Sequence, residues 1–64
     1  MKDDEFYCGQ IMLLLKLIRI PLSINAIAKK TGFSWVTTKK YLLKLEEEGK
    51  IKQTEVGKWV RFDA

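Results

Sequence analysis

The chain has 64 residues, 47% of them hydrophobic, and a formal net charge of +4. At this length it forms one domain at most, and such a domain buries only about 60% of the surface that its unfolded chain exposes. The hydrophobic content is too high for a disordered chain, so a core must form. One cysteine and no histidine exclude an intrachain disulfide and disfavour a structural zinc site. Stability must therefore come from tight packing or from a second copy of the chain.

Positive charge is concentrated in the middle of the chain. Residues 23–45 carry five lysines and no acidic residue, whereas residues 1–22 and 46–64 are each close to neutral. One sign of charge gathered on one element is typical of a protein that binds a polyanion. The alternative is a solvated lysine face that has no partner.

The first predicted element is a helix over about residues 5–19. Asp3, Asp4 and Glu5 stand at its start, where acidic side chains interact favourably with the helix dipole. Pro21 ends the helix because it disfavours a helical conformation at the residue before it.

This helix is not predicted to cross a membrane. Lys16 and Arg19 interrupt its hydrophobic run, which is also shorter than the roughly 20 apolar residues that a membrane span requires. The opening sequence, MKDDEFYCGQ, lacks the basic and then apolar pattern of a signal peptide. We therefore expect a cytoplasmic protein with no membrane partner.

The same helix carries two apolar stripes, where a surface helix usually needs one. The expected core stripe consists of Ile11, Leu14, Leu15 and Ile18. The second stripe consists of Phe6, Leu13, Leu17 and Ile20, with Gln10 among them. We predict that this second stripe is the interface of a two-fold homodimer, which pairs the same patch with itself. The alternative is that it covers the C-terminal strands of the same chain.

A second short helix is predicted over about residues 24–31. Ser23 or Asn25 can cap its start, because both side chains accept hydrogen bonds from free backbone N–H groups. Gly32 fits the left-handed position just past its end.

A third helix is predicted from Ser34, a good N-cap, to about residue 48, with Gly49 closing it. Helical spacing places one apolar face against the other helices. That face consists of Thr38, Tyr41, Leu42 and Leu45. The opposite face carries Val36, Lys40, Leu43 and Glu47, flanked by Lys39 on one side and by Thr37 and Lys44 on the other.

Two short β-rich segments, 51–55 and 58–62, surround Val56-Gly57 and predict a two-stranded hairpin. Alternation along the second strand puts Val60 and Phe62 on one face, which we expect to be buried. Trp59 and Arg61 share the other face, where Trp59 covers either the edge of the core or a partner.

In this arrangement the chain resembles the winged helix-turn-helix proteins, chiefly small prokaryotic and archaeal transcriptional regulators. The resemblance covers about residues 11–62 and rests on the segments Ile24–Ser34 and Tyr41–Ile51. The family has a small residue where Ala28 stands, a turn glycine at Gly32, and a Leu-Glu-x-x-Gly-x-Ile ending that matches Leu45–Ile51.

One departure from the family pattern is Thr38, where a valine or isoleucine is usual. A buried threonine can bond back to a helix carbonyl, so the fold is not in doubt. The resemblance implies a mainly α fold with a small β-hairpin, in the order helix, helix, helix, strand, strand. A single domain would span residues 1–64, with the helix-turn-helix at about 24–48 and the wing at about 50–62.

The resemblance also implies sequence-specific binding of double-stranded DNA, with the third helix in the major groove and the wing on the backbone or minor groove. An α-helix fits the major groove and reaches base edges with its N-terminal residues. The expected DNA-binding residues are Ser34, Trp35, Val36, Thr37, Lys39, Lys40 and Lys44 on the helix, and Lys52, Lys58 and Arg61 on the wing. Trp35 can instead pack on a loop, and Lys52 and Lys58 can instead protect a sheet edge.

No pattern in the chain supports catalysis, because there is no histidine, no nucleophile beside a base, and no phosphate-cradling glycine loop. We expect a transcriptional regulator without a cofactor, a metal or a small-molecule ligand. A homodimer would match a palindromic site. Such a small regulator fits an archaeal, viral or plasmid genome and a location at the nucleoid or in the host cytoplasm. The main alternative is a winged-helix module for protein–protein interaction, since fold alone does not settle function.

Overall fold

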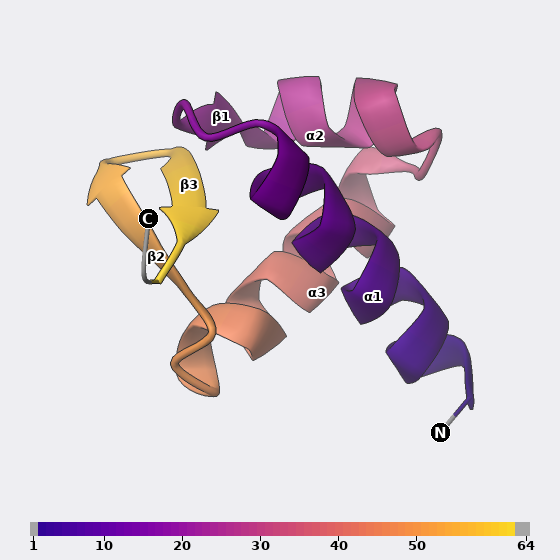
Figure 1. Cartoon of the computed structure of the whole chain (residues 1–64). Coiled ribbons are helices and arrows are strands. Elements are labelled where there is room, and N and C mark those ends of the chain that lie inside the picture. Colours follow the sequence, from indigo (N-terminus) through magenta and orange to yellow (C-terminus); the bar gives the residue numbers. More distant parts are fainter. Residues whose placement is uncertain (1, 63–64) are drawn as a thin grey trace.

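The computed structural model describes residues 2–62. It contains three helices and three short strands in the order α1 (Lys2–Leu17), β1 (Leu22–Ser23), α2 (Ile24–Thr31), α3 (Trp35–Glu47), β2 (Ile51–Glu55) and β3 (Lys58–Arg61). Figure 1 shows α1 crossing α3, with the sheet beside the C-terminal halves of both helices. The mainly α character and the C-terminal hairpin are as predicted, and the arrangement is consistent with a winged helix.

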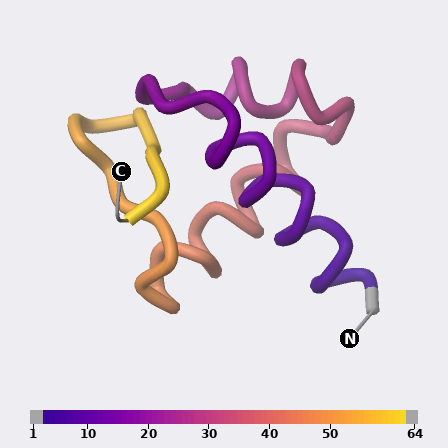
Figure 2. Tube along the Cα trace, viewed as in Figure 1, coloured from indigo at the N-terminus to yellow at the C-terminus, as the bar shows by residue number. Residues whose placement is uncertain are grey.

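The order of helices and strands predicted from the sequence did not include β1. This strand has only two residues, Leu22 and Ser23, and pairs antiparallel with β3 through Leu22 opposite Trp59 and Ser23 opposite Lys58. Two residues are too short to show the alternation by which a strand is recognised. Figure 2 shows the C-terminal segment returning beside the chain that follows α1. The strand order in the sheet is β1-β3-β2, so β3 is the central strand.

Local chemistry explains the ends of the helix-turn-helix. Ser23 rather than Asn25 caps α2, because its Oγ accepts the N–H of Ala26 at 3.2 Å. Gly32 ends this helix with a φ of 81°, a left-handed conformation that glycine adopts without a steric penalty. The bounds of α2 are those predicted, whereas α1 starts and ends a few residues earlier than predicted.

Ser34 caps α3, and its Oγ accepts the N–H of Thr37 at 3.1 Å. Thr38 is fully buried, and its Oγ1 donates a 2.8 Å hydrogen bond to the carbonyl of Ser34. The expected back-bond to a helix carbonyl is therefore present.

The core lies where α1, α2, α3 and the sheet meet, and it includes the predicted core face of α3. Its buried hydrophobic members are Ile11, Leu15, Leu22, Ile27, Tyr41, Leu42, Leu45, Ile51 and Trp59. Aromatic rings join the start of α1 to the turn before α3: Tyr7 meets Phe33 edge to face at 4.8 Å between centroids, and it stacks on Tyr41 at 5.1 Å. These contacts fix the orientation of α3 relative to α1.

The wing corrects one prediction about burial. Phe62, expected inside, is 58% exposed, whereas Trp59 and Val60 are both buried. Alternation predicts one buried face only for a strand that is covered on one side. Both faces of β3 are covered at Trp59 and Val60, and Phe62 lies beyond the end of the strand at Arg61.

The second stripe of α1 is open to solvent. Its members are between 50% and 72% exposed: Phe6, Leu13, Leu17 and Ile20. The wing therefore does not cover this stripe within the chain, and the alternative in which it did is wrong. No helix in the described part of the chain is long and apolar enough to cross a membrane.

Candidate nucleic-acid interface

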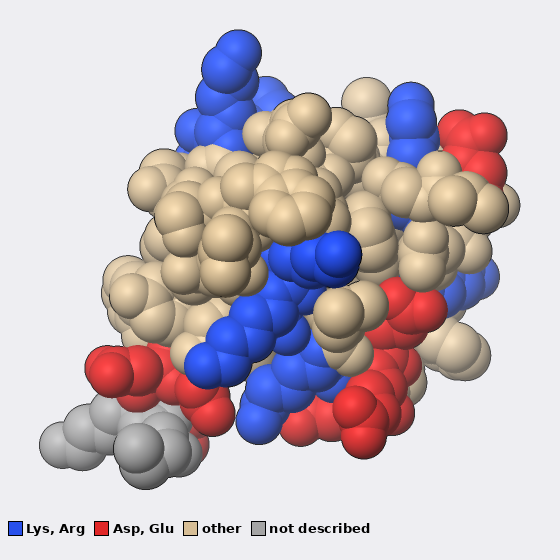
Figure 3. All heavy atoms as spheres, turned by 180° about the vertical axis from the view of Figure 1, so that it is seen from behind, with Lys and Arg blue, Asp and Glu red and all other residues tan. Residues whose placement is uncertain are grey.

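One long side of α3 is left open, because α1, α2 and the sheet pack against its other sides. Val36 is 71% exposed on this side, and Trp35, Lys39, Lys40 and Leu43 are exposed as well. Figure 3, which views the molecule from behind, shows lysine and arginine atoms across the middle of that face and acidic atoms towards its lower corners and at its upper right edge. The sequence-predicted recognition surface is thus accessible, and its centre is basic.

Trp35 and Lys39 form one unit of this surface. Trp35 and Lys39 are four residues apart, so they lie on successive turns of α3. The Nζ of Lys39 lies 5.1 Å from the centroid of the Trp35 ring. A cation over an indole face is held by the charge distribution of the ring. Trp35 remains 47% exposed, so the pair presents both an aromatic surface and an ammonium group to a partner.

The hydroxyl groups at the start of α3 are partly committed to capping. Ser34 Oγ accepts the backbone N–H of Thr37 and donates to Thr37 Oγ1 at 2.9 Å. Thr37 Oγ1 acts as the acceptor in that second bond, so its own proton is left to donate to a phosphate or base oxygen. Of the two predicted DNA-contacting hydroxyls, Ser34 and Thr37, the Thr37 hydroxyl is therefore the better placed hydrogen-bond donor.

The two remaining lysines of α3 diverge. Lys40 is exposed, and its Nζ lies 5.3 Å from the centroid of the Tyr41 ring. The Nζ of Lys44 lies 3.6 Å from Asp4 of α1. The structure thus leaves Lys40 on the open side with Lys39, whereas the ammonium group of Lys44 pairs with Asp4 of α1.

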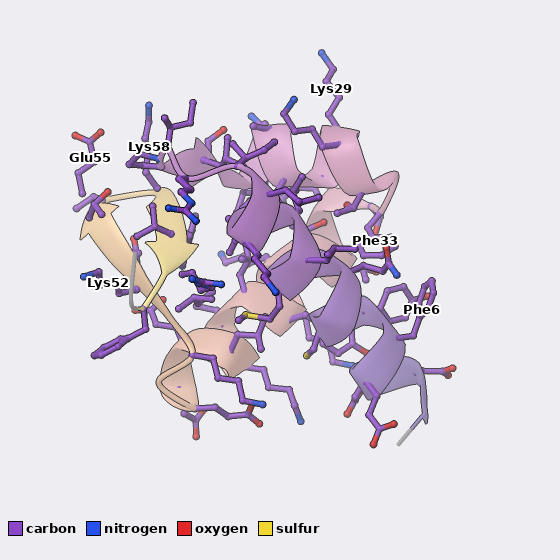
Figure 4. All side chains as sticks on the ribbon, viewed as in Figure 1. Phe6, Lys29, Phe33, Lys52, Glu55 and Lys58 are labelled. Atoms are coloured by element: carbon purple, nitrogen blue, oxygen red, sulfur yellow. The ribbon has the colours of Figure 1, made fainter. Side chains whose placement is uncertain are left out.

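The basic residues of the wing lie on different parts of the sheet. Figure 4 shows Lys52, Lys58 and Glu55 projecting from the sheet away from the helices. Lys58 stands directly opposite Glu55 in the strand register, and the Nζ of Lys52 lies 5.6 Å from the ring of Phe62. Arg61 is half-buried and makes interactions within the chain. Lys52 and Lys58 are therefore the more accessible of the three predicted wing contacts.

Two basic residues near this surface were counted in the charge pattern but not assigned to the site. Lys29 and Lys30 occupy the last turn of α2 and are exposed. Figure 4 shows Lys29 extending away from the body of the molecule. They add positive charge beside the turn that leads to α3, and the acid-free stretch 23–45 was the signal that could have included them.

Glu46, in the last turn of α3, connects this helix to the wing. Its Oε1 accepts the indole N–H of Trp59 at 3.1 Å, and its carboxylate accepts the side-chain N–H of Gln53 at 3.2 Å and 3.3 Å. Gln53 Oε1 in turn accepts the N–H of Gly57 at the tip of the wing. This chain of bonds fixes the wing relative to α3, so these two elements have a defined separation.

A second polar link ties α1 to α3 through Tyr41 and Asp4. The Tyr41 hydroxyl donates a 2.8 Å hydrogen bond to Asp4 Oδ1. This bond raises the pKa of Tyr41 to about 12 and holds the pKa of Asp4 below its ordinary value, with Lys44 adding to the latter effect.

A cavity of about 410 Å³ lies between α1 and the C-terminal end of α3. Its walls carry both signs of charge, from residues such as Glu5, Glu48, Lys44 and Lys50. Cys8 also lines it, and partial burial raises the pKa of this thiol, which disfavours the reactive thiolate. Within residues 2–62 no group of three or more histidine, cysteine, aspartate or glutamate side chains is placed to hold a metal ion.

Comparison with known proteins gives one match. No curated protein and no solved structure matches the chain significantly. The model of the FaeA-like protein family matches residues 8–61, a stretch that holds all of α2, α3 and the sheet and most of α1. That family is one of winged-helix-like regulators. Because the match covers most of the chain, this protein belongs to the FaeA-like protein family.

Proposed function

We propose that this protein is a transcriptional regulator that binds double-stranded DNA in a sequence-specific manner through α3. The observation that carries the proposal is the open side of α3, where exposed Lys39 and Lys40 lie in a stretch of the chain, residues 23–45, without an acidic residue. Membership of a family of winged-helix-like regulators supports it.

In the proposed complex the N-terminal half of α3 enters the major groove. Lysine ammonium groups donate to guanine O6 and N7 or to phosphates, and the exposed methyl groups of Val36 can contact a thymine methyl. The Thr37 hydroxyl donates to a phosphate or base oxygen, while Ser34 keeps its role as the cap. Trp35 supplies an apolar surface beside Lys39.

The distribution of acidic residues favours this docking direction. Glu46, Glu47 and Glu48 lie at the C-terminal end of α3, farthest from the proposed base contacts. The Glu46 carboxylate is engaged by Trp59 and Gln53, which reduces its repulsion of phosphates. The basic half of α3 therefore faces the DNA, and the acidic end points out of the groove.

The wing contributes contacts to the sugar–phosphate backbone in this proposal. Lys52 and Lys58 are exposed on the sheet, and phosphate contacts of this type supply affinity and register but little sequence information. Val56 is 99% exposed at the tip, and apolar side chains at such positions can enter the minor groove.

A titration of a labelled duplex pool with the purified protein tests the proposal through Lys39. Fluorescence anisotropy at low salt is expected to show that Lys39→Ala weakens binding by about 1–3 kcal/mol. The matched control is Lys50→Ala, which removes the same charge beside Glu48, its partner at 3.5 Å, and is expected to bind almost as the wild type. Equal losses in the two variants would reject α3 as the contact.

A protein–protein interaction module is the second candidate. The observation that favours it is the apolar content of the open side of α3, where Trp35, Val36 and Leu43 are all exposed. Protein interfaces are enriched in aromatic residues at their centres. Under this alternative, duplex DNA does not bind at low salt, whereas Leu43→Lys abolishes binding of a partner protein.

A further inference from the structure

We propose that α1 associates with α1 of a second copy in an antiparallel pair, centred between Gln10 and Leu13. This inference concerns assembly and is independent of the proposed DNA binding. It rests on three features of the exposed surface of α1: the spacing of its apolar residues, the distribution of its charges, and a glycine that nothing within the chain explains.

The spacing of the exposed residues is that of a coiled-coil seam. Phe6, Gln10, Leu13 and Leu17 follow one another at alternating intervals of four and three residues. Ile20 has the next spacing but lies in the segment after the helix, which ends at Leu17. This spacing keeps side chains on one line along a helix and is characteristic of helices that pack along their length against another helix. Within the chain this line meets no other element over most of its surface, because its apolar members are half or more exposed.

The polar member of the seam lies close to its middle. Gln10 is exposed between the apolar residues Phe6 and Leu13. A single polar residue at such a position specifies the register and number of helices in a coiled coil. In an antiparallel pair centred between Gln10 and Leu13, the two Gln10 side chains lie near the two-fold axis, where their amides can bond to each other.

The charges of α1 favour the antiparallel orientation over the parallel one. Its first turn carries acidic residues, whereas Lys16 and Arg19 lie at and beyond its last turn. Asp4 is occupied by Tyr41 and Lys44, but Asp3 and Glu5 are exposed. An antiparallel pair places the acidic end of each helix beside the basic end of its mate. A parallel pair places like charges together, which is unfavourable.

Gly9 supplies the third feature. It lies inside α1 and is exposed, and a Cβ built on it would meet no atom within 4 Å. Glycine in a helix interior destabilises the helix relative to alanine, and no contact inside the described part of the chain requires its small size. Beside the seam, the absence of a side chain lets the backbone of a second helix approach closely.

Cysteine cross-linking tests both the contact and its orientation, on a Cys8→Ser background that removes the native thiol. In an antiparallel pair centred between Gln10 and Leu13, Phe6 of one copy faces Leu17 of the other. A mixture of Phe6→Cys and Leu17→Cys proteins is therefore expected to form a disulfide-linked dimer under mild oxidation, whereas each variant alone is not. Val56→Cys, at the exposed tip of the wing, reports the background of random collisions. Rapid cross-linking of either single variant with itself, above that background, would overturn the antiparallel pair.

Charge exchange gives a second test that does not alter the apolar stripe. Glu5→Lys and Lys16→Glu are each expected to weaken self-association by roughly tenfold, since two symmetric pairs turn from attraction to repulsion. The double variant is expected to associate within about twofold of the wild type. Sedimentation equilibrium measures these constants, and circular dichroism checks that the variants fold. A wild-type protein that stays monomeric at every concentration, or a double variant without recovery, would overturn the proposal.

Discussion

The indole N–H of Trp59 donates a 3.1 Å hydrogen bond to Glu46 Oε1 and so joins the central strand of the sheet to the last turn of α3. Trp59 is buried, whereas the Glu46 residue is half-buried, so the bond is shielded from water on one side. Gln53 bonds to the same carboxylate and extends the link to Gly57 in the wing. The position of the wing beside α3 therefore depends on one carboxylate.

Replacing Glu46 with alanine is expected to destabilise the protein by about 1–3 kcal/mol, because the Trp59 N–H loses its acceptor in a buried setting. Urea unfolding measures this change. The matched control is Glu47→Ala, an exposed neighbour, which is expected to change stability by less than about 0.5 kcal/mol. Equal stability of the two variants would show that the carboxylate does not hold the wing.

The bond between Tyr41 and Asp4 makes stability depend on pH at both extremes. Asp4 has a lowered pKa in the folded state because Tyr41 and Lys44 favour its charged form. Its contribution is therefore complete above the ordinary aspartate pKa of about 3.9 and is lost as the pH falls through the lowered value. The pKa of Tyr41 is raised to about 12, so its contribution is complete below about pH 10 and is lost as the pH rises towards 12.

Tyr41→Phe is expected to remove the dependence at high pH and to weaken the one at low pH, where Lys44 still favours the charged form of Asp4. Its stability relative to the wild type therefore improves below pH 4 and above pH 10. Thermal unfolding across the pH range measures this effect. In a Tyr7→Phe background, ultraviolet titration of the remaining phenol is expected to give a midpoint near 12. A midpoint near the ordinary value of about 10 would mean that the hydrogen bond does not persist in solution.

Thr38→Val is expected to be close to neutral, within about 1 kcal/mol. The carbonyl of Ser34 keeps a partner after the hydroxyl is lost, because it also accepts the backbone N–H of Thr38 at 2.9 Å. Burying a methyl group in place of a hydroxyl offsets the lost hydrogen bond. Thr38→Ala, which leaves a cavity in a fully buried position, should be clearly less stable than Thr38→Val in the same urea titration. The opposite order would show that the hydroxyl itself is required.

Lys40 and Lys58 are expected to differ in their effects on DNA binding. Lys40→Ala should weaken binding to a selected site more than binding to random DNA, because α3 is proposed to contact base edges. Lys58→Ala should weaken both about equally and lower the slope of affinity against salt by about one. Anisotropy titrations over a range of salt concentrations measure both quantities, and identical behaviour of the two variants would reject the division of roles between helix and wing.

Local signals in the sequence predicted most of the fold. The bounds of α2 and the capping roles of Ser34 and Gly32 followed from chemistry that acts over three or four residues. The core face of α3 followed from helical periodicity. These features were predictable because each depends on neighbours in the chain rather than on the tertiary arrangement.

Features that depend on tertiary contacts were missed. Trp59 was expected to cover the edge of the core or a partner, whereas it is a buried member of the core. Glu46 was not recognised as an acceptor, because its partners lie on other elements. Lys44 was grouped with the predicted DNA contacts, although its ammonium group pairs with Asp4 of α1. Helical spacing gives the direction of a side chain but not the partner that it finds there.

Selection of bound sequences from a randomised duplex pool, at ~50 and ~200 mM salt, tests the reading of DNA by α3 most directly. The expected result is enrichment of one motif, palindromic if α1 pairs as proposed, with Lys40→Ala reducing the enrichment and Lys50→Ala leaving it intact. Failure of the wild-type protein to bind duplex DNA even at the lower salt concentration would contradict the proposed function.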